Sequence, residues 1–102
     1  MAIFMVNKRI GETKFEWDPK KNQVNIEKHG VDFYVAQQAF FDKNRIIAED
    51  LDHSHKEKRF FCFGKISSRV ITVRFTWRNN IIRLIGAGYW RKGKKIYDEA
   101  QS

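Results

Sequence analysis

Residues 69–77 alternate between apolar and polar or small side chains, and this pattern restricts the fold more than any other feature of the sequence. Successive side chains of a β-strand point to opposite faces, so such alternation predicts a strand with one side buried. The predicted buried side consists of Ile71, Val73, Phe75 and Trp77. Arg74 falls on the other side, with Val70, Thr72 and Thr76. The strand therefore predicts a core on one face and a basic, accessible position on the other.

Three further segments have strand character, at residues 45–51, 59–66 and 81–87. Short polar turns at Ser67-Ser68 and Arg78–Asn80 connect the last three strands of the set. Consecutive strands joined by such turns pair antiparallel. The second half of the chain is therefore predicted to form a four-strand antiparallel meander.

The first half predicts a short strand at Lys14–Trp17 followed by two helices. The first helix starts at Asp18-Pro19, an N-cap acceptor followed by proline, and ends at Gly30. The second starts at Asp32, and residues 42–44 end it. Its predicted apolar face contains Phe33, Ala36, Gln37, Phe40 and Phe41. We therefore expect one α+β domain over residues 1–102, with 1–14 as a variable arm or edge strand.

The net positive charge of the chain lies entirely in its second half. The net charge is +8, yet residues 1–50 carry eight basic and eight acidic side chains. Between His53 and Lys95 there are twelve basic residues and one acid, Glu57. A sheet with one sign of charge attracts polyanions, which predicts contact with nucleic acid. The alternative is a solvated basic surface without a specific partner.

Composition argues against several other classes of protein. Cys62 is the only cysteine, so an intrachain disulfide is impossible and a buried, inert thiol is expected. No apolar run approaches the ~20 residues of a membrane span. We therefore expect a cytoplasmic protein. No cofactor is expected, because phosphate-binding and dinucleotide-binding glycine motifs are missing. His53 and His55 lack the further ligands of a metal site, so none is expected.

Ribonuclease chemistry without a metal needs a base for the 2′-OH, cations for the phosphate and an acid for the leaving oxygen. Arginine suits the phosphate because it donates two parallel hydrogen bonds. The candidate catalytic residues are His53, Glu57, Arg59, Arg74, Arg83 and Arg91. The candidate RNA-binding residues are Tyr89, Trp90, Lys92, Lys94 and Lys95. Structural alternatives remain for them: a turn position for His53, a pair of Arg83 with Glu57, and packing of Trp90 on the sheet.

The basic tail allows two interpretations. If residues 91–99 form a helix, the bases lie at its N-terminus and Asp98 and Glu99 at its C-terminus, against the helix dipole. Gly93 weakens such a helix further. The segment is then either a frayed terminus or one positioned for contact with a ligand.

Several motifs resemble the BrnT toxin family. They are Phe15–Pro19 with Lys21 and Asn25, Lys28–Val31 with Phe33, Ala36, Phe40 with Asp42, Asp52–Ser54, Glu57 with Arg59, Gly64, and Ile82–Ala87. The resemblance covers residues 15–97. In one respect the chain departs from the family: the arginines that commonly follow the last strand are replaced by Gly88, Tyr89 and Trp90, with Arg91 displaced.

This resemblance implies a RelE-like α+β fold and a ribonuclease toxin that blocks translation. It also implies RNA as the substrate and a cognate ribbon-helix-helix antitoxin, through which the protein would contact operator DNA. The departure at Gly88 and Tyr89 motivates an alternative, a non-catalytic basic module that binds nucleic acid or a partner and acts in operon autorepression.

Overall fold

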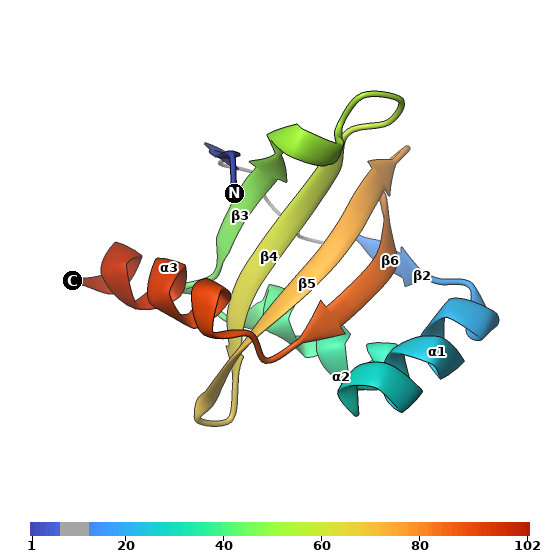
Figure 1. The fold of residues 1–102 in the computed structure, drawn as a ribbon, viewed down its shortest axis with the longest axis horizontal. Coiled ribbons are helices and arrows are strands. Elements are labelled where there is room, and N and C mark those ends of the chain that lie inside the picture. Colours follow the sequence, from blue (N-terminus) through green and yellow to red (C-terminus); the bar gives the residue numbers. More distant parts are fainter. Residues whose placement is uncertain (7–12) are drawn as a thin grey trace.

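The computed structural model describes residues 1–6 and 13–102, which form a mixed sheet with helices on both faces (Figure 1). Within these residues the sheet has six strands in the order β1-β3-β4-β5-β6-β2. The strands are β1 (Ile3–Val6), β2 (Lys14–Glu16), β3 (Ile46–Asp50), β4 (Arg59–Ile66), β5 (Arg69–Arg78) and β6 (Ile81–Gly88). The helical segments are α1 (Pro19–His29), α2 (Phe33–Ala36), η1 (Gln37–Phe41), η2 (Leu51–His53) and α3 (Arg91–Gln101).

The sheet is larger than the four-strand meander expected from the sequence. Strands β3 to β6 pair antiparallel in chain order, but β1 adds to the free side of β3 and β2 pairs parallel to β6. The strands β1 and β2 are short, and each pairs with a strand far away in the sequence. Local alternation cannot reveal such pairing. The arm expected at residues 1–14 thus contains β1, while residues 7–12 lie outside the described residues.

Helix α1 begins and ends as predicted. Asp18 Oδ1 accepts a hydrogen bond from the Lys20 backbone N–H at 2.8 Å, and Pro19 is the first helical residue. Gly30 ends the helix with φ +67°, a left-handed conformation that costs glycine little. The buried Asn25 side chain ties α1 to the sheet, because it donates to Ala87 O and accepts from Ala87 N.

The second helix differs from the prediction of one amphipathic α-helix. It is a single α-helical turn, α2, followed by the 3₁₀ segment η1. A 3₁₀ helix has three residues per turn. Accordingly, Ala36, the N-cap of η1, and Ala39 are buried at a spacing of three, together with Phe33 in α2 and Phe40, whereas Phe41 is exposed. These residues pack on the face of the sheet formed by Ile71, Val73 and Phe75, the strand face predicted to be buried.

Helix α3 covers part of the opposite face, so the basic tail is not frayed. Tyr97 is buried against Phe61, Phe63 and Ala48, and its hydroxyl donates to Asp42 Oδ2 at 2.6 Å. Burial alone would raise the pKa of Asp42, but this bond and backbone N–H groups outweigh burial and lower the pKa. A methyl group at Gly93 would lie 1.9 Å from Thr72 Oγ1. The glycine that weakens the helix therefore permits close packing on β5.

A second glycine sets the distance between η1 and the sheet. A methyl group added at Gly64 in β4 would lie 2.3 Å from the backbone oxygen of Ala39. Because backbone cannot rotate away as a side chain can, we expect Gly64→Ala to lower the free energy of unfolding by about 3 kcal/mol. Urea denaturation measures this change. The control is Gly86→Ala, where the nearest contact would be an ordinary 3.8 Å; equal losses in both variants would contradict the steric explanation.

Cys62 is fully buried, as expected, and desolvation raises the pKa of its thiol. In the part of the chain that the structure describes, no helix is both long and apolar enough to cross a membrane.

Candidate nucleic-acid and active site

Three of the arginines proposed from the sequence lie on one face of the sheet, the face opposite α2 and η1. Arg59 pairs with Thr76, and Thr76 pairs with Arg83, so these residues form a row across β4, β5 and β6. Arg74 occupies the same face of β5, two residues before Thr76. Helix α3 contacts β4 and β5 but covers this face only in part (Figure 1). Thr76 is nevertheless buried, so neighbouring side chains already cover the centre of this row.

A β-bulge adjoins Arg74. Arg74 pairs with Gly86 and Phe75 pairs with Leu84, so Ile85 is an extra residue on β6. Bulges bend a strand locally and change the direction of nearby side chains. Gly86 has no side chain to compete for space, and Arg74 Cδ and Nη1 lie close above it. Arg74 thus points into a hollow beside β6.

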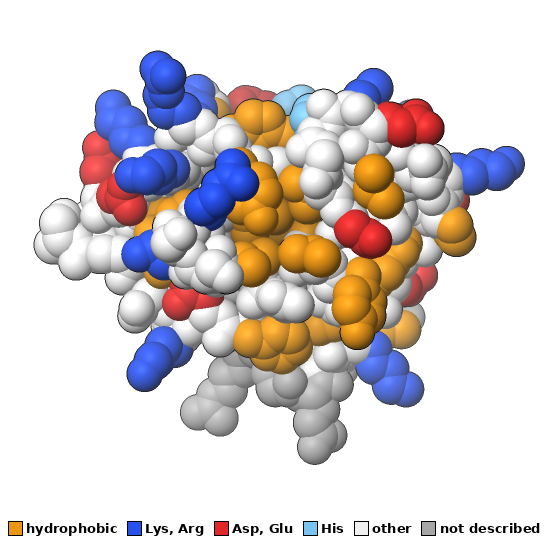
Figure 2. All heavy atoms as spheres, turned by 90° about the horizontal axis from the view of Figure 1, so that it is seen from below, with side chains coloured by type: hydrophobic (Ala, Val, Ile, Leu, Met, Phe, Trp, Pro, Cys, Tyr) orange, Lys and Arg blue, Asp and Glu red, His pale blue; other side chains and the backbone are white. Residues whose placement is uncertain are grey.

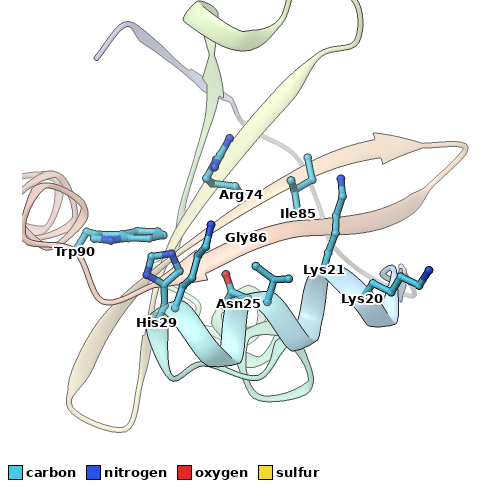
Figure 3. A pocket seen from close by; sticks show the side chains of 10 residues that line it. Lys20, Lys21, Asn25, His29, Arg74, Ile85, Gly86 and Trp90 are labelled. Atoms are coloured by element: carbon cyan, nitrogen blue, oxygen red, sulfur yellow. The ribbon is translucent and has the colours of Figure 1, made fainter.

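This hollow, here called the α1 hollow, has a volume of about 330 Å³. Figure 3 shows Arg74 on the sheet side, Lys21 and His29 on α1, and Trp90 at one end. Its lining residues are Lys20, Lys21, Val24, Asn25, Lys28, His29, Arg74, Ile85, Gly86 and Trp90. The lining contains four Lys or Arg side chains and no carboxylate, so the hollow favours an anion.

Residues of α1 were missed as site residues by the sequence analysis. Its lysines belong to the half of the chain whose charges balance, and Lys28-His29 contributed only to the family resemblance. A signal was nevertheless present. Lys21 and Lys28 recur at positions i and i+7, which share one helix face, and Lys20 and His29 flank them on either side.

The position of Trp90 accounts for the glycine at position 88. A methyl group at Gly88 would lie 2.6 Å from Trp90 Cζ2, so the indole packs directly over the end of β6. The ring of His29 contacts the indole edge-on, with 5.1 Å between centroids and an angle of 78°. Trp90 lines three neighbouring hollows and is half-buried. A fixed indole at such a junction can stack with a nucleobase.

The second of these cavities, the His53 hollow, has a volume of about 400 Å³. It shares Arg74 and Trp90 with the α1 hollow and adds Lys92, Phe61 and a paired histidine. His53 Nδ1 lies 2.8 Å from Oδ2 of Asp50, whose side chain is 3% exposed. A carboxylate only accepts hydrogen bonds, so His53 donates from Nδ1, and in the neutral imidazole its Nε2 is left as an acceptor.

Asp50 is a further site residue that the sequence did not reveal. It ends β3, and its backbone oxygen accepts a hydrogen bond from Ser54 Oγ, which holds the turn to His53. The signal for it was the spacing of Asp50 and His53, three residues apart. A spacing of three residues brings the two side chains together only because the chain turns at η2.

Two other candidate catalytic residues, Glu57 and Arg83, lie outside these hollows. Glu57 forms a bidentate ion pair with Arg78, at 2.5 and 3.0 Å. The hydrogen bond from Arg78 lowers the pKa of Glu57, and Glu57 lines none of the three hollows. The suggested pair of Arg83 with Glu57 is wrong, because Arg83 Nη1 instead contacts Glu16 Oε2 at 2.6 Å. Glu16 lies on β2, whose position beside β6 the sequence did not reveal.

The remaining tail residues are divided between cavities. Tyr89, Arg91 and Lys94 line a third cavity of about 310 Å³, here called the Tyr89 hollow. Arg91 therefore does not join Arg74 in one cavity, Lys92 lies in the His53 hollow, and Lys95 lines none of the three. The expected cationic surface is thus only partly built from the second half of the chain. Part of its charge comes from α1, and other basic side chains project around the molecule (Figure 2).

The described residues contain no group of three or more His, Cys, Asp or Glu side chains arranged to hold a metal ion. The cations that face the hollows are arginines and lysines, which can bind a phosphate directly.

Comparison with known proteins identifies the family. A family model described as the ribonuclease toxin BrnT of a type II toxin–antitoxin system matches residues 17–93. This range includes α1, Asp50, His53, Arg74 and Trp90, and it ends within the first turn of α3. A comparison with curated proteins gives no significant match. The chain belongs to the BrnT family of ribonuclease toxins of type II toxin–antitoxin systems.

Proposed function

We propose that this protein is a metal-independent endoribonuclease that cleaves RNA at the junction of the α1 hollow and the His53 hollow. The observation that carries the proposal is that Arg74 and Trp90 line both cavities, with a histidine in each. The junction thus combines a phosphate ligand, a stacking surface and two groups able to transfer protons.

In the proposed reaction, His53 Nε2 removes the proton of the ribose 2′-OH. The 2′ oxygen then forms a bond to phosphorus, and the bond from phosphorus to the 5′ oxygen breaks. His29 donates a proton to that leaving oxygen. The products are a 2′,3′-cyclic phosphate and a 5′-hydroxyl end. Arg74, with Lys21 and Lys28, stabilises the charge that builds on the phosphate oxygens, as preorganised donors do in other enzymes.

The family implies an antitoxin as well as an RNA substrate. We propose that the antitoxin is of the ribbon-helix-helix type, that it covers the basic hollows, and that operator DNA is contacted through it. Acidic segments on the antitoxin would fit the cations of these cavities. Inhibition of translation would follow from cleavage of RNA that is needed for protein synthesis.

The test is cleavage of single-stranded RNA by the purified, antitoxin-free protein in EDTA. We expect cleavage with cyclic phosphate ends, and no cleavage where the nucleotide on the 5′ side of the bond lacks its 2′-OH. If EDTA abolished cleavage and added Mg²⁺ restored it, metal independence would be contradicted. RNA binding without cleavage under any condition would favour the non-catalytic module, as would normal growth of cells that express the protein alone.

A further inference from the structure

The Tyr89 hollow adjoins the proposed active site and is strongly basic. Trp90 lines it as well as the two catalytic hollows. Its full lining is Ser68, Arg69, Val70, Tyr89, Trp90, Arg91 and Lys94. Three cations from two separate elements, β5 and α3, therefore converge there, and the lining contains no carboxylate. Three like charges that line one cavity repel one another, and a bound anion relieves this repulsion.

Arg69 is held in a way that leaves its hydrogen-bond donors available. Its Cζ lies 3.8 Å from the centroid of the Tyr89 ring, which is stacking geometry. Stacking occupies the face of the guanidinium, whereas its N–H groups lie in the plane and can donate elsewhere. Among the described residues, Arg69 forms no ion pair with a carboxylate. A phosphate matches the spacing of these donors.

Helix α3 supplies an independent reason for an anion here. Its N-cap residue, Trp90, makes no side-chain hydrogen bond to the first turn, and that turn contains no acidic residue. The backbone N–H groups of a first turn and the helix dipole both favour negative charge. Arg91 and Lys94 interact unfavourably with the dipole. Because the first turn contains no acidic side chain, a bound anion would stabilise this helix terminus.

We propose that the Tyr89 hollow is a second phosphate subsite, which holds the phosphate of an RNA nucleotide next to the one whose base stacks on Trp90. This inference rests on the proposed function and adds to it the direction in which the RNA leaves the active site. The bound strand runs from the junction at Arg74, across Trp90, to Arg69 at the start of β5. The enzyme accordingly prefers substrates that extend beyond the scissile bond.

The test uses 2′-O-methyl oligonucleotides of increasing length, which lack the 2′-OH nucleophile and cannot be cleaved. For the unchanged protein we expect a step of about tenfold in affinity when the added nucleotide brings the phosphate that reaches Arg69. Arg69→Ala should remove this step and reduce the slope of log affinity against log salt by about 0.7, as for one phosphate. Arg69→Lys keeps the charge without the planar fork and should retain part of the step.

The matched control is Lys56→Ala, which removes one exposed positive charge from the loop before β4 and affects none of the three hollows. It should preserve the step. A step that persists in Arg69→Ala overturns the proposal, even if that variant binds a glutamate-rich peptide less well, because the hollow would then serve a protein partner. These oligonucleotides are not cleaved, so a failure of the ribonuclease assay leaves this measurement interpretable.

Discussion

Arg74→Ala is expected to lower the rate of RNA cleavage by about 10²- to 10³-fold, because Arg74 is the cation shared by the two proposed catalytic hollows. The loss should appear mainly in kcat. The α1 hollow retains Lys20, Lys21 and Lys28, which continue to attract RNA, whereas the donors at the junction are gone. Cleavage of a fluorescent single-stranded RNA, with affinity measured separately on an uncleavable analogue, distinguishes the two effects.

The control for Arg74 is Arg78→Ala. Both arginines occupy the same face of β5, and each substitution removes one charge, but Arg78 is paired with Glu57 and lines none of the three hollows. We expect Arg78→Ala to change kcat less than about threefold, consistent with the small effect of exposed pairs. Similar losses in both variants would show that general attraction of RNA, and not a positioned arginine, governs the rate.

His53→Ala is expected to slow cleavage by about 10²- to 10⁴-fold, since it removes the proposed general base. Asp50→Asn should reduce kcat by a comparable factor while KM and RNA binding stay nearly unchanged. The amide can donate to His53 Nδ1, which would place the proton on Nε2 and leave no acceptor for the 2′-OH. The role proposed for Asp50 is that of a positioning residue, because its carboxylate contacts His53 and no step of the proposed reaction uses it directly. Nitrogen chemical shifts of the His53 ring report the tautomer directly.

The neighbouring His55 provides the control, because it lies in the same loop and lines none of the three hollows. His55→Ala should cleave RNA at the normal rate. Combining His53→Ala with Asp50→Asn should cost little more than His53→Ala alone, because the two residues act as a unit. Additive losses, or an unchanged tautomer in Asp50→Asn, would refute the positioning role.

Local chemistry determined much of this protein from the sequence alone. The Asp18-Pro19 start and Gly30 end of α1 are short-range effects of capping and backbone conformation, and they appear as predicted. The alternation along β5 likewise identifies the face that packs on α2 and η1, although Val70, Thr72 and Thr76 on the Arg74 face, predicted to be accessible, are buried as well. The asparagine turn between β5 and β6 has positive φ at Asn79 and Asn80, as a tight hairpin requires. Each of these features depends on residues within a few positions of one another.

Only the tertiary structure decided the composition of the site. The sequence separates Lys28 and His29 from Trp90 by some sixty positions, and they meet because Asn25 holds α1 to the edge of β6. The pair Arg83–Glu16 depends on β2 lying beside β6, and the pair Glu57–Arg78 depends on β4, which follows the Glu57 loop, lying beside β5; local patterns leave both open. In the sequence, Gly93 indicates a weak helix and Gly88 a departure from the family resemblance, yet each leaves room for a specific neighbour, Thr72 or Trp90. Side-chain periodicity specifies which face a residue takes, whereas strand order and close packing specify what it meets there.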